Sequence, residues 1–91
     1  MEYSLVILKS AETDMDALDA PTRIRIVERL EWLGKNADQV AHHRLQGMPE
    51  KLAGLCRFRV GDYRVLYWKR DSPPTLFAFR VRHRSVVYKN L

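Results

Sequence analysis

The feature that most restricts the fold is a run near the middle of the chain, LCRFRVGDYRVLY at positions 55–67. Apolar and aromatic residues alternate with arginine on both sides of Gly61–Asp62, and two-residue links of this kind join the strands of tight hairpins. Alternation with a period of two is typical of strands that bury one face. The run therefore predicts two antiparallel strands, at about residues 55–60 and 63–69, whose apolar face needs a cover.

The residues before and after this hairpin supply the cover and the rest of the sheet. Residues 3–8 (YSLVIL) are apolar on both alternations, which indicates a strand covered on both faces. Ser10 can cap a helix that begins at Ala11, Pro21 suits the first turn of a second helix, and residues 75–82 alternate like a further strand. This order predicts an α+β fold in one domain, residues 1–91: an N-terminal strand, a two-helix hairpin, then three antiparallel strands, with the helices packed on one sheet face.

The alternation also predicts where the charged side chains point. If Cys56, Phe58 and Val60 face the helices, Arg57 and Arg59 face away from them, because an unpaired guanidinium is costly to bury. We expect Phe77, Phe79 and Val81 to face the helices as well. The opposite, open face, turned to solvent or to a ligand, would then carry the arginines of all three strands and Trp68, with further basic and aromatic residues at its edge: Arg57, Arg59, Arg64, Arg80, Arg82, Trp68, His83, Arg84, Tyr88 and Lys89.

The charge balance suggests what such a face would bind. Lys and Arg number 16 against 11 Asp and Glu, which gives a net charge of +5. Asp62, in the turn, is the one acid between residues 55 and 70. Exposed sheet faces often carry arginine for solubility alone, but such faces usually mix charge signs. Like charges on one face repel each other unless an anion binds, so we favour a phosphate-binding surface.

Other kinds of site have little support. Cys56 is the single cysteine, so no intrachain disulfide can form, and its place in a strand favours a small buried residue over a nucleophile. His42 and His43 lack the spacing and the partners of a metal site, and no glycine-rich nucleotide loop is present. We expect no metal and no cofactor. The sequence has no signal peptide and no apolar run long enough to span a membrane, so we expect a cytoplasmic protein without a membrane partner.

Three motifs resemble one known family. RFRVGDYRVLY at 57–67 is similar to the signature of the RelE/ParE superfamily of toxins from bacterial and archaeal toxin–antitoxin modules, and so are VRHRSVVY at 81–88 and HRLQG at 43–47. The resemblance covers nearly the whole chain. It implies a toxin with a RelE-like fold that a cognate antitoxin wraps and neutralises, and that meets operator DNA only within the toxin–antitoxin complex. The RelE-like branch cleaves mRNA in the ribosomal A site, whereas the ParE-like branch poisons DNA gyrase without cleaving RNA.

The basic residues retained here resemble those of the cleaving branch, which implies an endoribonuclease acting on ribosome-bound mRNA. The implied catalytic set is Arg57, Arg59, Arg64, Arg82, Arg84 and Tyr88, and the implied RNA-binding set is Arg80, His83, Lys89 and Trp68. One departure is that the best-known RelE-type enzymes carry lysine at the positions of Arg57 and Arg59. Because arginine does not lose its proton, neither residue can be a general base.

The residues permit a metal-free reaction in which a ribose 2′-OH attacks its own 3′-phosphate. Arg57 would hold the phosphate while Arg59 and Arg64 stabilise the negative charge of the transition state. Tyr88 is the first candidate for the base and His83 the alternative. Either Arg82 or Arg84 would stabilise the leaving 5′-oxygen. Against these roles stand structural ones: Tyr88 as a C-terminal anchor, and His83 with Arg84 as a turn-stabilising pair.

Overall fold

The computed structural model describes residues 1–91 and confirms the predicted α+β order. It adds one very short strand and two single 3₁₀ turns that the sequence did not predict. In chain order the elements are β1 (Ser4–Ile7), α1 (Lys9–Asp16), α2 (Ala20–Lys35), η1 (Ala37–Gln39), β2 (His43–Arg44), η2 (Glu50–Leu52), β3 (Cys56–Val60), β4 (Tyr63–Asp71) and β5 (Pro74–His83). Neither α-helix is long and apolar enough to cross a membrane.

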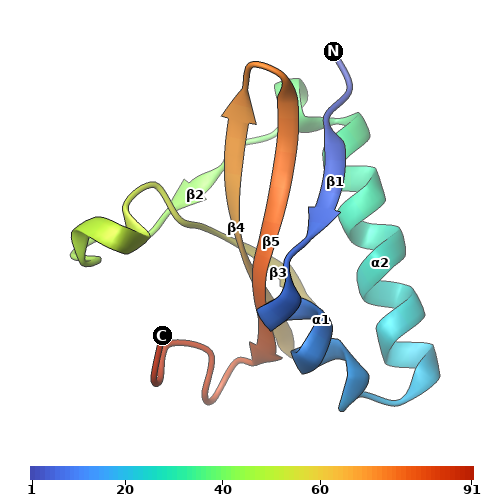
Figure 1. Cartoon of the computed structure of the whole chain (residues 1–91). Coiled ribbons are helices and arrows are strands. Elements are labelled where there is room, and N and C mark those ends of the chain that lie inside the picture. Colours follow the sequence, from blue (N-terminus) through green and yellow to red (C-terminus); the bar gives the residue numbers. More distant parts are fainter.

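The five strands form one mixed sheet in the order β1-β5-β4-β3-β2. The first strand, β1, runs parallel to β5, and every other neighbouring pair is antiparallel. Both helices lie on one side of the sheet, while the segment containing η2 and the C-terminal tail lie on the other side (Figure 1). The far face is therefore partly covered, which corrects the expectation that it is wholly open.

The two helices begin for different local reasons. The Asp19 carboxylate accepts a hydrogen bond from the Thr22 backbone N–H at 3.3 Å, and Pro21 stands in the first turn of α2, as predicted. The predicted cap of α1 is wrong, because α1 begins at Lys9 and Ser10 lies inside its first turn. The Ser10 hydroxyl instead donates to the Phe79 carbonyl at 2.6 Å, which ties α1 to β5.

A first core lies between the helices and the sheet. Ile26 and Leu30 of α2 pack against Val65, Ala78 and Val81 of the sheet, and all five are almost completely buried. The helix approaches the N-terminus closely at Gly34, where an added Cβ would lie 2.6 Å from the Tyr3 carbonyl oxygen. Only a glycine allows that approach without a backbone shift.

A second, smaller core lies on the far face. Leu55, Leu66 and Val87 are buried there. Partly buried apolar side chains from the tail, from the segment before β3 and from the sheet surround them: Leu45, Trp68, Phe79 and Leu91. The tail therefore packs on the sheet, and this packing sets how much of the far face remains free.

An irregularity in β5 changes which of its residues face the helices. Leu66 pairs with Arg80 but Tyr67 pairs with Ala78, so Phe79 is an extra residue without a partner. For the residues of β5 that precede the bulge, each side chain faces the side opposite to the one that simple alternation predicts. Ala78 lies in the helix-side core, and Phe79 stacks on Trp68 of the far face with ring centroids 5.0 Å apart. The expectation for Val81 is confirmed, whereas the one for Phe79 is wrong.

The same inversion moves Phe77, which the sequence also placed under the helices. Its β4 partner is Trp68, and the two line one shallow hollow together with Arg70. Phe77 therefore lies on the far face as well, and that expectation is wrong too.

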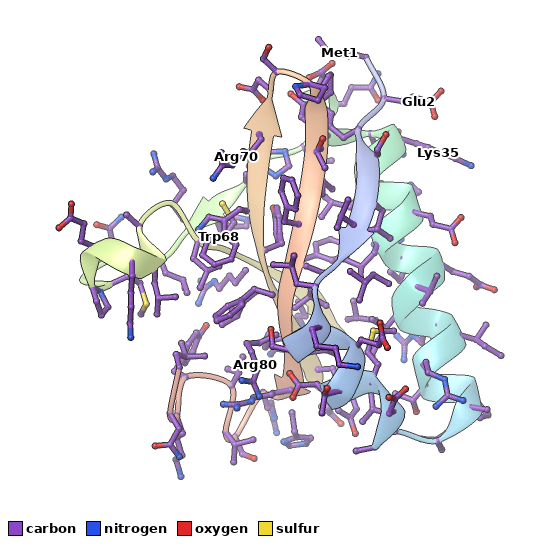
Figure 2. All side chains as sticks on the ribbon, in the orientation of Figure 1. Met1, Glu2, Lys35, Trp68, Arg70 and Arg80 are labelled. Atoms are coloured by element: carbon purple, nitrogen blue, oxygen red, sulfur yellow. The ribbon has the colours of Figure 1, made fainter.

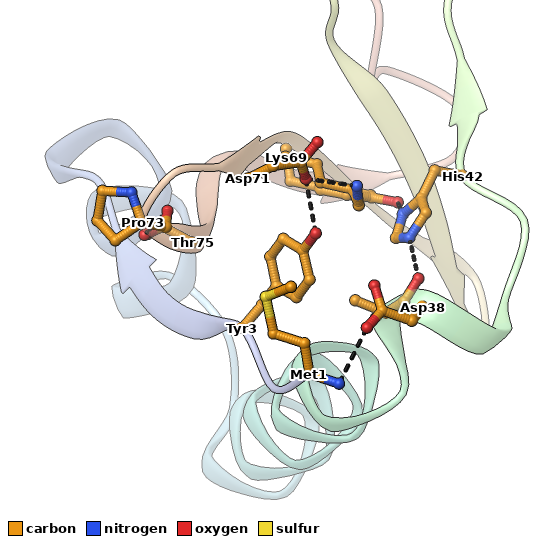
Figure 3. Close-up of polar contacts among 10 residues, drawn as sticks. Met1, Tyr3, Asp38, His42, Lys69, Asp71, Pro73 and Thr75 are labelled. Carbon is orange, nitrogen blue, oxygen red and sulfur yellow. Dashed lines mark hydrogen bonds and ion pairs between the residues drawn. The ribbon is translucent and has the colours of Figure 1, made fainter.

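A polar network ties the N-terminus to the end of β4 (Figure 3). The Tyr3 hydroxyl donates to the Asp71 carboxylate at 2.6 Å, and the Lys69 ammonium lies 2.7 Å from the same oxygen. The N-terminal amino group lies 3.0 Å from the Asp38 carboxylate. The bonds from Lys69 and Tyr3 lower the pKa of Asp71, and the bond to Asp71 raises the pKa of both Tyr3 and Lys69.

Candidate nucleic-acid interface

Three arginines form a row across the sheet on its far face. Arg59 of β3 is directly opposite Arg64 of β4, which is directly opposite Arg82 of β5. Side chains at such positions have Cβ atoms only about 4.5–5.5 Å apart, and like charges there destabilise a sheet. The row is therefore a feature that folding alone does not favour.

Beside this row the surface is hollowed. His43, Arg57, Arg59 and Arg64 line a hollow of about 300 Å³, here called the arginine hollow. His43 is there because β2 pairs with β3 and sets His43 opposite Arg57. No acidic side chain lines the hollow, and none of its three arginines forms an ion pair. The predicted grouping of Arg57, Arg59 and Arg64 is thus present in the structure.

The turn of the hairpin fixes one member of the row. The Arg64 Nη1 donates to the Gly61 carbonyl at 2.9 Å and to the Tyr63 carbonyl at 3.0 Å. Gly61 has a φ of +59°, a left-handed conformation that glycine adopts readily. The tight turn therefore orients the Arg64 guanidinium without neutralising it.

Arg80 differs from the arginines of the row because an acid of the chain neutralises it. Its Nε and Nη2 each lie 2.8 Å from one oxygen of the Asp14 carboxylate, which also accepts the Val81 backbone N–H. The side chain lies next to α1 at the lower end of β5 (Figure 2). The register places Arg80 opposite Leu66 of the far face, as expected, but Asp14 neutralises its charge, so Arg80 adds no free cation to that face.

Arg84 is a weaker case of the same kind. Its Nε is 3.9 Å from the Asp62 carboxylate, and both side chains are well exposed. Such a pair contributes little to stability. Arg84 stands beyond the end of β5, beside the hairpin turn.

His83 points away from the arginine row because it is the next residue after Arg82. Its ring packs edge-on against Tyr63, with centroids 5.7 Å apart. Its Nδ1 accepts the Ser85 backbone N–H at 3.2 Å and lies 2.9 Å from the Ser85 hydroxyl. The turn-stabilising role weighed from the sequence thus fits His83, with Ser85 rather than Arg84 as its partner.

The tail brings Tyr88 over the far face. Val87 is buried against Leu66 in the second core, and the Lys89 carbonyl accepts a hydrogen bond from Arg82. Tyr88 stands between these two anchor points, is 45% exposed, and its hydroxyl bonds to no other group of the chain. Val87 and Lys89 hold the tail on the sheet. Tyr88 is therefore not needed as an anchor, and its exposed ring is free to contact a ligand.

Trp68 lies on the far face as predicted, but it also has a structural task. Its indole N–H donates to the Ala53 carbonyl at 3.0 Å, and its ring packs on Phe79.

Sequence analysis missed His43 and Arg44 of β2, because a two-residue strand has no readable alternation. The HRLQG motif around them was the available signal.

Cys56 is a buried thiol on the helix side of β3. Burial raises its pKa, and its sulfur lies 3.5 Å from the Gly54 carbonyl oxygen. It is therefore a packing residue, as expected. No group of three or more His, Cys, Asp or Glu side chains gathers to form a metal site.

The sequence matches one protein family over most of its length. Residues 5–88 match the family described as ParE toxin of type II toxin–antitoxin system, parDE. The chain belongs to this family, within the RelE/ParE superfamily, and is a toxin of a type II toxin–antitoxin system. No curated protein sequence matches it significantly.

Solved RelE structures share the fold. A chain of the RelBE2 toxin–antitoxin complex from Mycobacterium tuberculosis is 28% identical, with a TM-score of 0.77 over 93% of this chain and 94% of that one. A mutant of E. coli toxin RelE in the free state is 22% identical, with a TM-score of 0.73 over 97% and 92%. A chain of the archaeal RelE–RelB complex from Pyrococcus horikoshii OT3 is 23% identical, with a TM-score of 0.71 over 92% and 97%. The RelE-like fold is thus confirmed.

Proposed function

We propose that this toxin is an endoribonuclease that cleaves mRNA on the ribosome, and that a cognate antitoxin neutralises it. One observation carries the proposal. The arginine hollow and Arg82 hold four guanidinium groups without carboxylate partners, next to a tail that presents a free tyrosine. Such a surface suits a phosphodiester backbone, and because the target is translated message, the toxin acts in the cytoplasm.

In the proposed reaction the 2′-oxygen forms a bond to its own 3′-phosphorus, and the bond from phosphorus to the 5′-oxygen of the next nucleotide breaks. The products are a 2′,3′-cyclic phosphate and a 5′-OH. Arg57 holds the phosphate, and Arg59 and Arg64 stabilise the charge that gathers on its oxygens. Fixed cationic donors of this kind contribute most to such reactions. Arg64 suits this role because the turn carbonyls already orient it.

The proton of the 2′-OH needs an acceptor. Arginine cannot accept it, and His83 faces away from the hollow. We assign the role to Tyr88, and His43, which lines the hollow opposite Arg57, is the alternative acceptor. The leaving 5′-oxygen takes a proton from water while Arg82 stabilises its charge. Arg82 also holds the Lys89 carbonyl, so it positions the tail that carries Tyr88. Arg84, exposed beside the hairpin turn, contributes to binding the message.

The antitoxin has a suitable surface beside the hollow. Trp32, Val40 and Phe58 contribute apolar area to a groove of about 350 Å³ that Arg57 and Arg59 also line. Trp32 is 40% exposed. An antitoxin segment with acidic and apolar residues complements this groove and would cover the arginines of the hollow. Several solved relatives are toxin–antitoxin complexes of the RelBE type. Operator DNA would be bound by that complex and not by the free toxin.

The test is to map mRNA ends in a translating cell extract by primer extension, with and without the protein. The wild-type toxin should arrest translation and leave cuts inside translated codons. Arg64→Ala should remove the cuts, and Lys35→Ala, the same charge change on the exposed end of α2, should keep them. Arrested translation with intact message contradicts the proposal.

A second function has one observation in its favour. The matching family is described as the ParE toxin, and the ParE-like branch was the alternative from the sequence. A non-catalytic gyrase inhibitor predicts that cleaved DNA–gyrase complexes accumulate while mRNA stays intact. Purified gyrase with plasmid DNA, run beside the extract assay, separates the two.

A further inference from the structure

A second basic hollow lies on the sheet where β4 extends past β3. Cys56, the first residue of β3, pairs with Tyr67, so β4 continues for four residues without a β3 partner. The segment before β3 crosses this gap and leaves a hollow of about 440 Å³, here called the Trp68 pocket. It is lined by His42, Arg44, Ala53, Gly54, Cys56, Trp68, Lys69 and Arg70. The arginine hollow shares none of these residues.

The Trp68 pocket is cationic and contains no acid. Lys69 is paired with Asp71, but Arg44 and Arg70 are exposed and form no ion pair. Trp68 and Arg70 both project from β4 on the side where β2 lies (Figure 2). The two guanidinium groups beside the indole therefore carry positive charge that no acid of the chain neutralises.

The indole is held in one position. Its N–H is bonded to the Ala53 carbonyl, and Phe79 supports its ring. Gly54 has a φ of +84°, a left-handed conformation that favours glycine, and a Cβ there would stand at ordinary contact distance from Arg44 Nη2 (3.5 Å) and Trp68 Cδ1 (3.7 Å). A fixed aromatic wall costs little entropy when a planar group stacks on it.

We propose that the Trp68 pocket binds one nucleotide of single-stranded RNA, with the base against Trp68 and its phosphate between Arg44 and Arg70. An acidic peptide would use the two arginines but leave the indole without a partner, whereas a nucleotide uses both. The proposal deepens the proposed function and rests on it for the identity of the ligand. It adds a contact outside the catalytic hollow, so it affects binding of the message and not the chemical step.

The test uses Trp68 as its own reporter. In a Trp32→Phe background, Trp68 is the sole tryptophan. The probe is a mixed-sequence RNA hexamer with 2′-O-methyl riboses, which lack the nucleophile and cannot be cut. We expect saturable quenching of the Trp68 fluorescence. The double variant Arg44→Ala/Arg70→Ala should raise the midpoint about tenfold or more, with an unchanged melting temperature, because both side chains are exposed.

The matched control is Lys9→Ala/Lys35→Ala, which removes the same charge from the two helices and should shift the midpoint less than about threefold. A hexaglutamate peptide should quench Trp68 weakly. Equal quenching by that peptide, or a hexamer midpoint that the two arginine substitutions leave unchanged, overturns the proposal. Quenching that depends on Arg44 and Arg70 in a protein that cuts no mRNA would reject the proposed cleavage and retain this pocket.

In the extract assay the same double variant should raise the message concentration needed for half-maximal cutting and leave the maximal rate unchanged. A loss of maximal rate alone would mean that these arginines act on the chemical step, and would overturn the assignment of a binding site.

Discussion

Replacing Arg64 with alanine should separate catalysis from folding. Arg64 stands in the middle of the cationic row, between Arg59 and Arg82, with its Nη1 bonded to two turn carbonyls. If the row stabilises a phosphoryl transition state, the loss of this fixed donor should lower the cleavage rate by about 10²–10³, equivalent to about 2.7–4 kcal/mol.

The effect of the same substitution on stability should be small. Arg64→Ala removes two hydrogen bonds to turn carbonyls, each contributing about 1 kcal/mol. It also relieves repulsion from the two facing arginines, which costs about 0.2–1 kcal/mol per pair. The free energy of unfolding should therefore fall by less than about 1.5 kcal/mol. Arg80→Ala should have the opposite profile. It leaves the largely buried Asp14 carboxylate without its cation and should cost about 3 kcal/mol, the low end for a broken buried pair because Asp14 keeps the Val81 N–H bond, with little effect on the rate per folded molecule.

The two variants should be compared by primer extension at saturating protein and by urea unfolding. Arg64→Lys is a useful third variant, since it keeps the charge but loses the planar fork, and should recover only part of the activity. A cleavage rate for Arg64→Ala within about threefold of wild type would refute the catalytic role. So would a stability loss large enough to explain the missing activity.

Three further outcomes follow from single side chains. Tyr88→Phe should lower single-turnover cleavage by at least about 10² without moving the melting temperature, because the hydroxyl bonds to no other group of the chain. Val87→Asp, which puts a carboxylate into the second core, should release the tail and lower the urea midpoint, with hydrogen exchange reporting faster opening near Leu66. The pKa of Asp71 is lower in the folded state than in the unfolded state, where it is about 4. Its contribution to the stability of the fold is therefore complete above the unfolded pKa and is lost as the pH falls through the folded pKa. The melting temperatures of wild type and Asp71→Asn should differ at pH 7 and converge at about pH 2.

Local chemistry was enough to predict the hairpin. Gly61–Asp62 sets a two-residue turn, the turn sets the register, and the register puts Arg59 opposite Arg64. The alternation of buried and exposed residues in β3 followed directly. These features depend on residues close together in the chain, which is why a single sequence sufficed.

The features that sequence analysis missed depend on distant residues. The bulge at Phe79 has no glycine or other local signal, and it inverted the predicted faces of Phe77 and Phe79. Arg80 looked like its neighbours, but its partner Asp14 is 66 residues away and resembles any exposed acid of a short helix. The second core was missed for the same reason, since Val87 lies in a tail without periodicity.

The sheet can carry a row of like charges because it is packed on both faces. Val65 and Leu66, the residues that follow Arg64 in β4, are fully buried on opposite faces. Burying side chains of this size contributes about 1.5–3 kcal/mol each, which exceeds the repulsion between neighbouring arginines.

The chain neutralises Arg80, which is largely buried, and leaves Arg59, Arg64 and Arg82 without carboxylates. If that unmatched charge exists for an anion, binding a non-cleavable RNA should raise the melting temperature of wild type more than that of Arg64→Ala, because a ligand that binds only the folded state stabilises it in proportion to its affinity.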